Sequence, residues 1–189
     1  RWGGAQGLSS CLFVAAGTGM GGAYVVDGGV MRGAHGAAGH IGHITHPAAT
    51  GYTCACGADG HVESVTSGTG IGALYQGVSM MDPAFDPATD GGEVSRRAQA
   101  GEDKARETLA LAGRTLGEAI ASMVNILDPA AIVLTGTVTK AGPIWRAALE
   151  EGYRAQAMVP MLDTPILEAE LGGDAPLIGA AENLLDAIA

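Results

Sequence analysis

The strongest constraint on the fold is an amphipathic stretch over residues 103–127. Its apolar side chains recur at steps of three and four residues, the period of an α-helix that buries one face. The helix is predicted to end at Asp128-Pro129, because the residue before a proline disfavours the helical conformation. The uninterrupted apolar run that follows, residues 131–134, is typical of a strand buried on both faces of a sheet.

The remainder of the C-terminal half continues this alternation of helix and strand. Pro143 suits the first turn of a helix, which we expect to run to about residue 158. Residues 165–169 then indicate an edge strand, and residues 176–188 indicate a last helix. This alternation predicts an α/β fold, and a content of 47% hydrophobic residues in a chain of 189 suffices for one domain with its own core.

The N-terminal half begins with strand patterns. Residues 11–16 form a short apolar run, and residues 23–26 and 30–32 flank Asp27-Gly28-Gly29. We expect a β-hairpin there, because an Asp-Gly pair tolerates the positive φ that such turns need. Helical character is predicted again over residues 63–76.

A glycine-rich loop, Gly-Thr-Gly-Met-Gly-Gly at residues 17–22, directly follows the first predicted strand. Because glycine has no Cβ, the main-chain amides of such a loop can converge on a phosphate oxygen, with the Thr18 hydroxyl beside them. A dinucleotide-binding fingerprint would need a helix next, and a P-loop would need Lys followed by Ser or Thr, so both motifs are excluded. A tight turn between two strands is the alternative without a ligand.

Residues 33–60 show neither helical nor strand periodicity, so something other than a hydrophobic core must order this segment. Two thiols and two imidazoles in and beside it are a sufficient set for tetrahedral Zn²⁺, which would order the loop. These candidate ligands are His43, Cys54, Cys56 and His61. As alternatives, the cysteines are merely small buried residues, or His46 competes as a ligand.

A second polar group lies at the borders of this segment. His40, His43 and Glu63 could together hydrogen-bond the vicinal hydroxyls of a sugar, since a carboxylate accepts from two hydroxyls and an imidazole can donate or accept. A solvated histidine and a helix-capping glutamate are the alternative.

Charge and hydropathy exclude other classes of function. A formal net charge of −10 argues against binding of nucleic acid by this segment. No apolar run reaches the roughly 18–20 residues that span a bilayer, so we expect a cytoplasmic protein without a membrane anchor. Three cysteines cannot form a disulfide framework, which fits a reducing compartment. Because no initiator methionine precedes Arg1, we expect the chain to be part of a larger protein.

Taken in order, these motifs resemble the ROK family of bacterial sugar kinases and sugar-responsive repressors. The resemblance rests on residues 17–22, 27–29, 32–43 and 54–64, and it extends through residues 132–136 and 175–181. It implies an actin-like, ribonuclease-H-like ATPase fold with a zinc-ordered loop at about residues 40–63. ATP with Mg²⁺ and a hexose or N-acetylhexosamine would bind between two lobes, and the protein would be a homo-oligomer, a dimer.

The resemblance also implies roles for individual residues. Sugar binding is expected for His40, His43 and Glu63, nucleotide binding for Gly17, Thr18, Gly19 and Gly136, and zinc binding for His43, Cys54, Cys56 and His61.

This sequence departs from the family pattern in several places. His40 stands where the family usually has Glu, His61 replaces the third zinc cysteine, and residues 135–137 form a less glycine-rich turn. No Asp matches the family's catalytic base, which lies in the N-terminal half together with the first phosphate loop. We therefore expect residues 1–189 to be the C-terminal lobe, with the N-terminal lobe absent from the chain.

Two functions follow from the resemblance. A sugar kinase is favoured by the intact glycine loop of residues 17–22, which a protein without ATP need not keep. A sugar-sensing repressor with an upstream winged-helix head is favoured by His40 and by the altered turn at Gly136. A zinc-ordered interaction domain without sugar chemistry is the third alternative.

Overall fold

The computed structural model describes residues 3–188, and its centre is a mixed five-stranded sheet in the order β3-β2-β1-β4-β5. β1 pairs antiparallel with β2 and parallel with β4. The sheet therefore has an antiparallel part, made of the N-terminal strands, and a parallel part that includes the two C-terminal strands. The strands are β1 (Ser10–Ala16), β2 (Met20–Val26), β3 (Gly29–Val30), β4 (Ile132–Thr135) and β5 (Ile166–Glu168).

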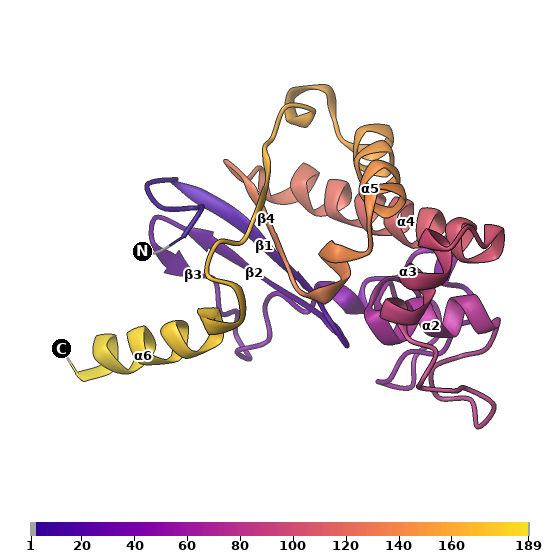
Figure 1. Cartoon of the computed structure of the whole chain (residues 1–189). Helices are drawn as coiled ribbons and strands as arrows, with labels where there is room; N and C mark the ends of the chain where they lie inside the picture. Colours follow the sequence, from indigo (N-terminus) through magenta and orange to yellow (C-terminus); the bar gives the residue numbers. More distant parts are fainter. Residues whose placement is uncertain (1–2, 189) are drawn as a thin grey trace.

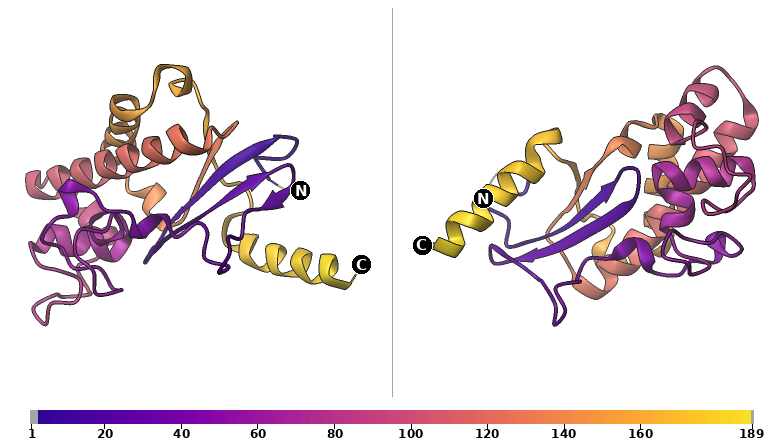
Figure 2. Two further views of the ribbon diagram at one scale, coloured as in Figure 1. Left: turned by 180° about the vertical axis from the view of Figure 1, so that it is seen from behind. Right: turned by 90° about the horizontal axis from the view of Figure 1, so that it is seen from below.

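The helices gather on one face and at one end of this sheet, except the last (Figures 1 and 2). α4 and α5 cover one face, α2 and α3 lie at the far end, and α6 projects away from the body in every view. The helices are α1 (Glu63–Thr66), α2 (Gly68–Gln76), α3 (Gly91–Gln99), α4 (Asp103–Leu127), α5 (Pro143–Gln156) and α6 (Ala175–Ile188). No helix in the described part of the chain is long and apolar enough to cross a membrane.

The core lies between the sheet and α4. Leu12 and Val14 of β1 and Ile132 of β4 pack with the buried face of α4, because alternate residues of a strand point to the same side. The other face of the sheet is less covered, and a groove of about 450 Å³ crosses it beside Phe13 and Val25.

Close packing of α4 on α5 depends on Gly117. A methyl group at this position would collide with the carbonyl oxygen of Leu149 and lie 2.8 Å from the amide nitrogen of Tyr153. We expect Gly117→Ala to lower the free energy of unfolding by about 1–3 kcal/mol, since the two helices would have to separate. The melting temperature should fall by several degrees.

A matched control for that variant is Gly179→Ala on α6, where a Cβ would meet nothing within 4 Å. Because alanine is a better helix former than glycine, this change should leave the melting temperature unchanged or raise it. Equal melting temperatures for Gly117→Ala and the wild type would refute the tight α4–α5 contact.

Most of the predicted elements are confirmed, although the strand predicted over residues 30–32 is only the two-residue β3. The helical character predicted over residues 63–76 is confirmed, but it is divided into α1 and α2, because Ser67 has extended backbone and accepts a hydrogen bond from the Gly70 amide as the N-cap of α2. Of the glycine loop, only residues 17–19 form the turn, since β2 begins at Met20. Sequence reasoning missed α3, which starts with two glycines and buries few apolar residues.

Candidate metal centre and ligand cleft

Four potential metal ligands converge beside the sheet. One ligand atom from each of His43, Cys54, Cys56 and His61 lies within 4.8 Å of the others. His43 ends a short 3₁₀ turn, the two cysteines lie in a turn at residues 54–57, and His61 lies just before α1. Sγ of Cys56 is 3.2 Å from Nδ1 of His61, and Sγ of Cys54 is 3.7 Å from Nδ1 of His43. Two sulfur and two imidazole donors at this spacing suit a tetrahedral Zn²⁺ ion.

Cys54 is fully buried within this cluster. Burial raises the pKa of its thiol to about 11, and the Glu63 carboxylate beside it adds to the shift. A metal ion must therefore displace the Cys54 proton in order to bind the sulfur.

We expect the zinc affinity of this centre to rise with pH. Below a thiol pKa of about 11, release of the Cys54 proton alone should change the apparent affinity about tenfold per pH unit. Competition with a chromophoric chelator at pH 7 and pH 8 measures this change. An affinity that is the same at both pH values would contradict it.

His46, the alternative ligand, points away from the cluster. Its Nδ1 accepts a hydrogen bond from the Ala48 amide at 3.2 Å, and its Nε2 lies 3.0 Å from a carboxylate oxygen of Glu118 on α4. Both ring nitrogens are thus occupied, and the contact attaches the loop to α4.

Glu63 connects the metal cluster to the glycine turn. Its Oε2 accepts a hydrogen bond from the Met20 amide at 2.7 Å, and its Oε1 accepts one from Sγ of Cys54 at 3.4 Å. The helix-capping alternative is wrong, because Val62 precedes α1 as the N-cap and no side chain caps it. The carboxylate therefore sets where β2 begins after the turn.

His40 lies at the exposed edge of the same region. Its Nδ1 is 2.8 Å from the carbonyl oxygen of Ala37, so this nitrogen carries the proton and donates. The His40 ring stacks on the His43 ring, with centroids 5.9 Å apart and planes inclined by 21°. His40 and His43 thus lie at the two ends of one 3₁₀ turn, and Sγ of Cys54 lies near both His43 and Glu63.

The glycine turn leads into a cleft of about 710 Å³ between α2, α3 and the 3₁₀ turn Thr137–Lys140. The carbonyl oxygen of Gly17 accepts a hydrogen bond from the amide of Gly68, the first residue of α2, at 2.7 Å, so α2 starts beside this turn. Thr18 is exposed and lines the cleft, whereas Gly17 and Gly19 on either side of it are not among the lining residues.

Gly136 lines a smaller adjoining hollow of about 310 Å³. Its φ is +99°, and a Cβ there would collide with the carbonyl oxygen of Ala16, so only glycine fits. This close approach holds the end of β4 against the end of β1.

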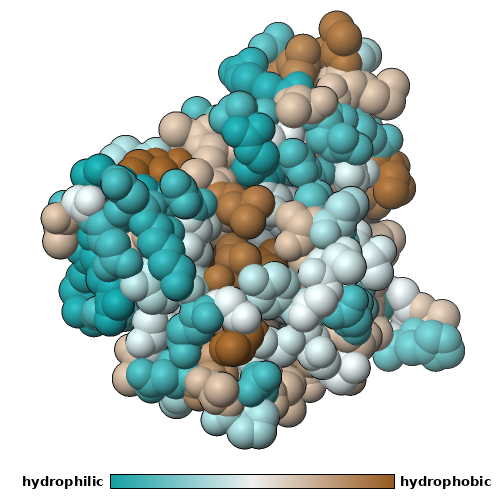
Figure 3. Space-filling view, turned by 90° about the vertical axis from the view of Figure 1, so that its right-hand side faces the viewer, coloured by the Kyte–Doolittle hydropathy of each residue, from teal (hydrophilic) through white to brown (hydrophobic). Residues whose placement is uncertain are grey.

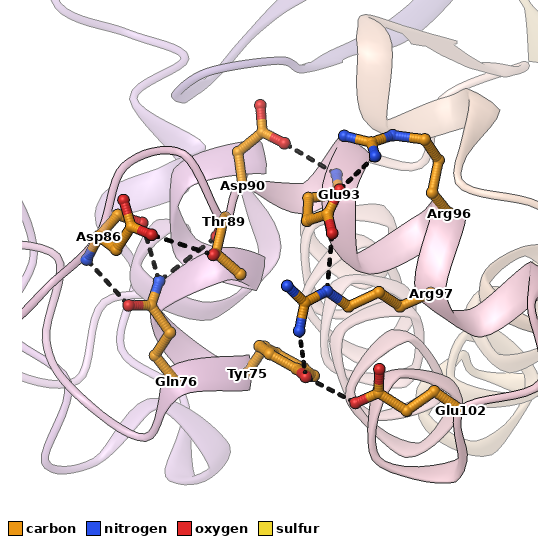
Figure 4. Close-up of polar contacts among 9 residues, drawn as sticks. All are labelled: Tyr75, Gln76, Asp86, Thr89, Asp90, Glu93, Arg96, Arg97 and Glu102. Carbon is orange, nitrogen blue, oxygen red and sulfur yellow. Dashed lines mark hydrogen bonds and ion pairs between the residues drawn. The ribbon is translucent and has the colours of Figure 1, made fainter.

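A polar network that sequence reasoning missed supports the α3 wall of the cleft (Figure 4). The Glu93 carboxylate pairs with Arg96 and Arg97, and Arg97 donates to the Tyr75 hydroxyl at 2.9 Å. The hydrogen bond from Arg97, with the charges of both arginines, lowers the pKa of the Glu93 carboxyl. The signal in the sequence was Asp90, which caps α3 by accepting from the Glu93 amide, with Glu93 three residues later.

The end of the molecule that carries α2 and α3 has a mixed surface, with hydrophilic residues gathered in patches and hydrophobic residues exposed near its centre (Figure 3). Such a mixed surface suits a small polar ligand with a hydrophobic part.

Comparison with known proteins gives a consistent result. The model of the ROK family matches residues 1–186. A glucokinase of Halalkalibacterium halodurans is 34% identical over 94% of this chain and 57% of its own length. An N-acetylmannosamine kinase of Escherichia coli is 33% identical over 92% of this chain and 56% of its own length.

Solved structures agree in fold. The ROK hexokinase of Thermus thermophilus superposes with a TM-score of 0.82 at 34% identity, covering 99% of this chain and 61% of that one. A ROK family transcriptional regulator, a homologue of the E. coli MLC protein, superposes with a TM-score of 0.71 at 26% identity, covering 89% and 43%. The chain thus spans between a half and two thirds of the length of the kinases it matches.

Proposed function

This chain belongs to the ROK family, and we propose that it is the C-terminal lobe of a sugar kinase that transfers the γ-phosphoryl group of ATP to a hexose or N-acetylhexosamine. The observation that carries the proposal is the contact of Glu63 with both the metal cluster and the glycine turn. This contact brings a candidate sugar site next to a candidate phosphate site. The catalytic base and the first phosphate loop would belong to a second lobe, which fits the partial coverage of the relatives.

Sugar hydroxyls would bind at His40, His43 and Glu63. The Glu63 carboxylate can accept from two hydroxyls, and the stacked imidazoles can each offer a donor or an acceptor. Because phosphoryl transfer depends mostly on positioning, the lobe's part in the reaction would be to hold the sugar in line with the nucleotide. At this site His40 offers an imidazole, which can donate or accept a hydrogen bond, rather than a second carboxylate.

ATP would bind with its phosphates near the turn of Gly17, Thr18 and Gly19 and its adenosine near Gly136. Mg²⁺ would neutralise part of the phosphate charge. The cleft of about 710 Å³ lies in the range of small-molecule sites.

Zn²⁺ would be held by His43, Cys54, Cys56 and His61 and would order the surrounding loop. These donors fit the ion in type and number, and His43 would link it to the sugar. The free thiols in the described chain fit the reducing cytoplasm as the place of action. We further propose that the intact protein forms a homodimer.

A sugar-sensing repressor is the second candidate. It is favoured by the structural likeness to a ROK transcriptional regulator and by the exposed His40, which offers no carboxylate to the sugar. In such a protein the sugar site would bind its ligand without turnover.

Sugar-dependent release of ADP by the intact protein tests the two candidates. We expect turnover with glucose or N-acetylmannosamine, well above the rate with ATP alone. Sugar binding without any ADP release, with a basic DNA-binding segment elsewhere in the intact protein, would instead establish the repressor.

A further inference from the structure

Lys140 is a cation of the cleft that no carboxylate neutralises. Within residues 3–188, the arginines of α3, α4 and α5 that form ion pairs do so with nearby glutamates or aspartates, but Lys140 has no such partner. The chain carries 20 acidic residues and only 10 basic ones, so Lys140 lacks a carboxylate partner in the described part of the chain although carboxylates outnumber cations two to one. An unpaired ammonium in this setting is available to an anionic ligand.

Lys140 lies at the border between the large cleft and the smaller hollow beside Gly136. It ends the 3₁₀ turn Thr137–Lys140, and with Thr137 it lines both the large cleft and the smaller hollow beside Gly136. The smaller hollow lies at the carboxyl ends of the parallel strands β4 and β5, where ligands of open α/β sheets bind.

Other polar groups of the cleft are also without partners. Within the described chain, the hydroxyls of Thr18 and Thr69 and the amide of Gln99 line the cleft and make no side-chain hydrogen bond. Arg96 is the second cation of this cleft, but its guanidinium is already paired with Glu93. Lys140 is therefore the cation best able to meet a phosphate.

We propose that Lys140 binds the phosphate chain of the nucleotide. This inference rests on the proposed kinase function and adds to it a residue that sequence motifs did not indicate. The ammonium would bind from the 3₁₀ turn Thr137–Lys140, and the Thr18 hydroxyl would donate from the glycine turn, since both residues line the cleft.

The test is nucleotide binding by the intact protein, measured by calorimetry. We expect Lys140→Met to raise the dissociation constants of MgATP and of inorganic tripolyphosphate about tenfold or more, since a charge-assisted hydrogen bond is lost. Adenosine, which has no phosphate, should bind as before. Lys140→Arg should recover most of the affinity, and in steady state the KM for ATP should rise while the KM for the sugar stays the same.

Arg154→Met is the matched control. Arg154 is exposed on α5, lies outside the cleft and has no carboxylate partner within the described residues, so its loss removes the same charge. The inference is overturned if Lys140→Met binds MgATP like the wild type, if Arg154→Met weakens binding equally, or if adenosine affinity falls as much as ATP affinity. A wild-type protein that binds no nucleotide would instead overturn the proposed function itself.

Discussion

His61→Ala is expected to lower the zinc affinity of the intact protein by more than about a hundredfold. Mutations of residues that merely support a metal ligand cost about 10–100-fold, and His61 supplies one of the four donor atoms. Residues 33–60 lack periodic apolar residues, so loss of the ion should also expose this segment to proteolysis. Zinc content per chain and the rate of limited proteolysis measure the two effects.

Two variants make the His61 result specific. His46→Ala should keep full zinc content, because both ring nitrogens of His46 are bonded elsewhere. His61→Cys should restore binding, since a thiolate is an equally suitable zinc ligand. Unchanged zinc content and proteolysis in His61→Ala would remove His61 from the ligand set.

Glu63→Ala is expected to reduce kcat/KM for the sugar by about a hundredfold or more. The Met20 amide would lose its acceptor at the point where the glycine turn passes into β2, and the sugar would lose a carboxylate. A displacement of about 1 Å in a reacting group can alone cost about a hundredfold. Steady-state kinetics with varied sugar and varied ATP measure the effect on each substrate.

Glu63→Gln separates the two roles of this carboxylate. Its amide oxygen can still accept from the Met20 amide, so the KM for ATP should stay near that of the wild type while the KM for the sugar rises. A wild-type kcat/KM in Glu63→Ala would show that Glu63 neither binds the sugar nor positions the turn.

The sequence was most informative where its signals were local. The helix over residues 103–127 was predicted with its correct ends because its apolar period is long and Asp128-Pro129 stops it. The strand at residues 131–134 was predicted within one residue, since a short apolar run needs no distant partner to be recognised. By contrast, the break between α1 and α2 at Ser67 was not predicted, because it is marked only by the hydrogen bond that the Ser67 hydroxyl accepts from the Gly70 amide.

The candidate site depends more on long-range contacts. The metal ligands His43, Cys54, Cys56 and His61 could be predicted from their spacing alone, because all four lie within one short segment of the chain. The bond between Glu63 and Met20 joins residues 43 positions apart, which no local pattern encodes. Likewise, the absence of a carboxylate partner for Lys140 among the described residues depends on which side chains the fold places near it, which the local sequence does not show.

The most direct measurement is the phosphorus NMR spectrum of a reaction mixture of the zinc-loaded intact protein, MgATP and sugar. The account predicts a sugar phosphate that forms in equal amount to ADP, with glucose or N-acetylmannosamine as the acceptor. ADP that forms with inorganic phosphate alone, or ATP that remains unconsumed while sugar is bound, would contradict it.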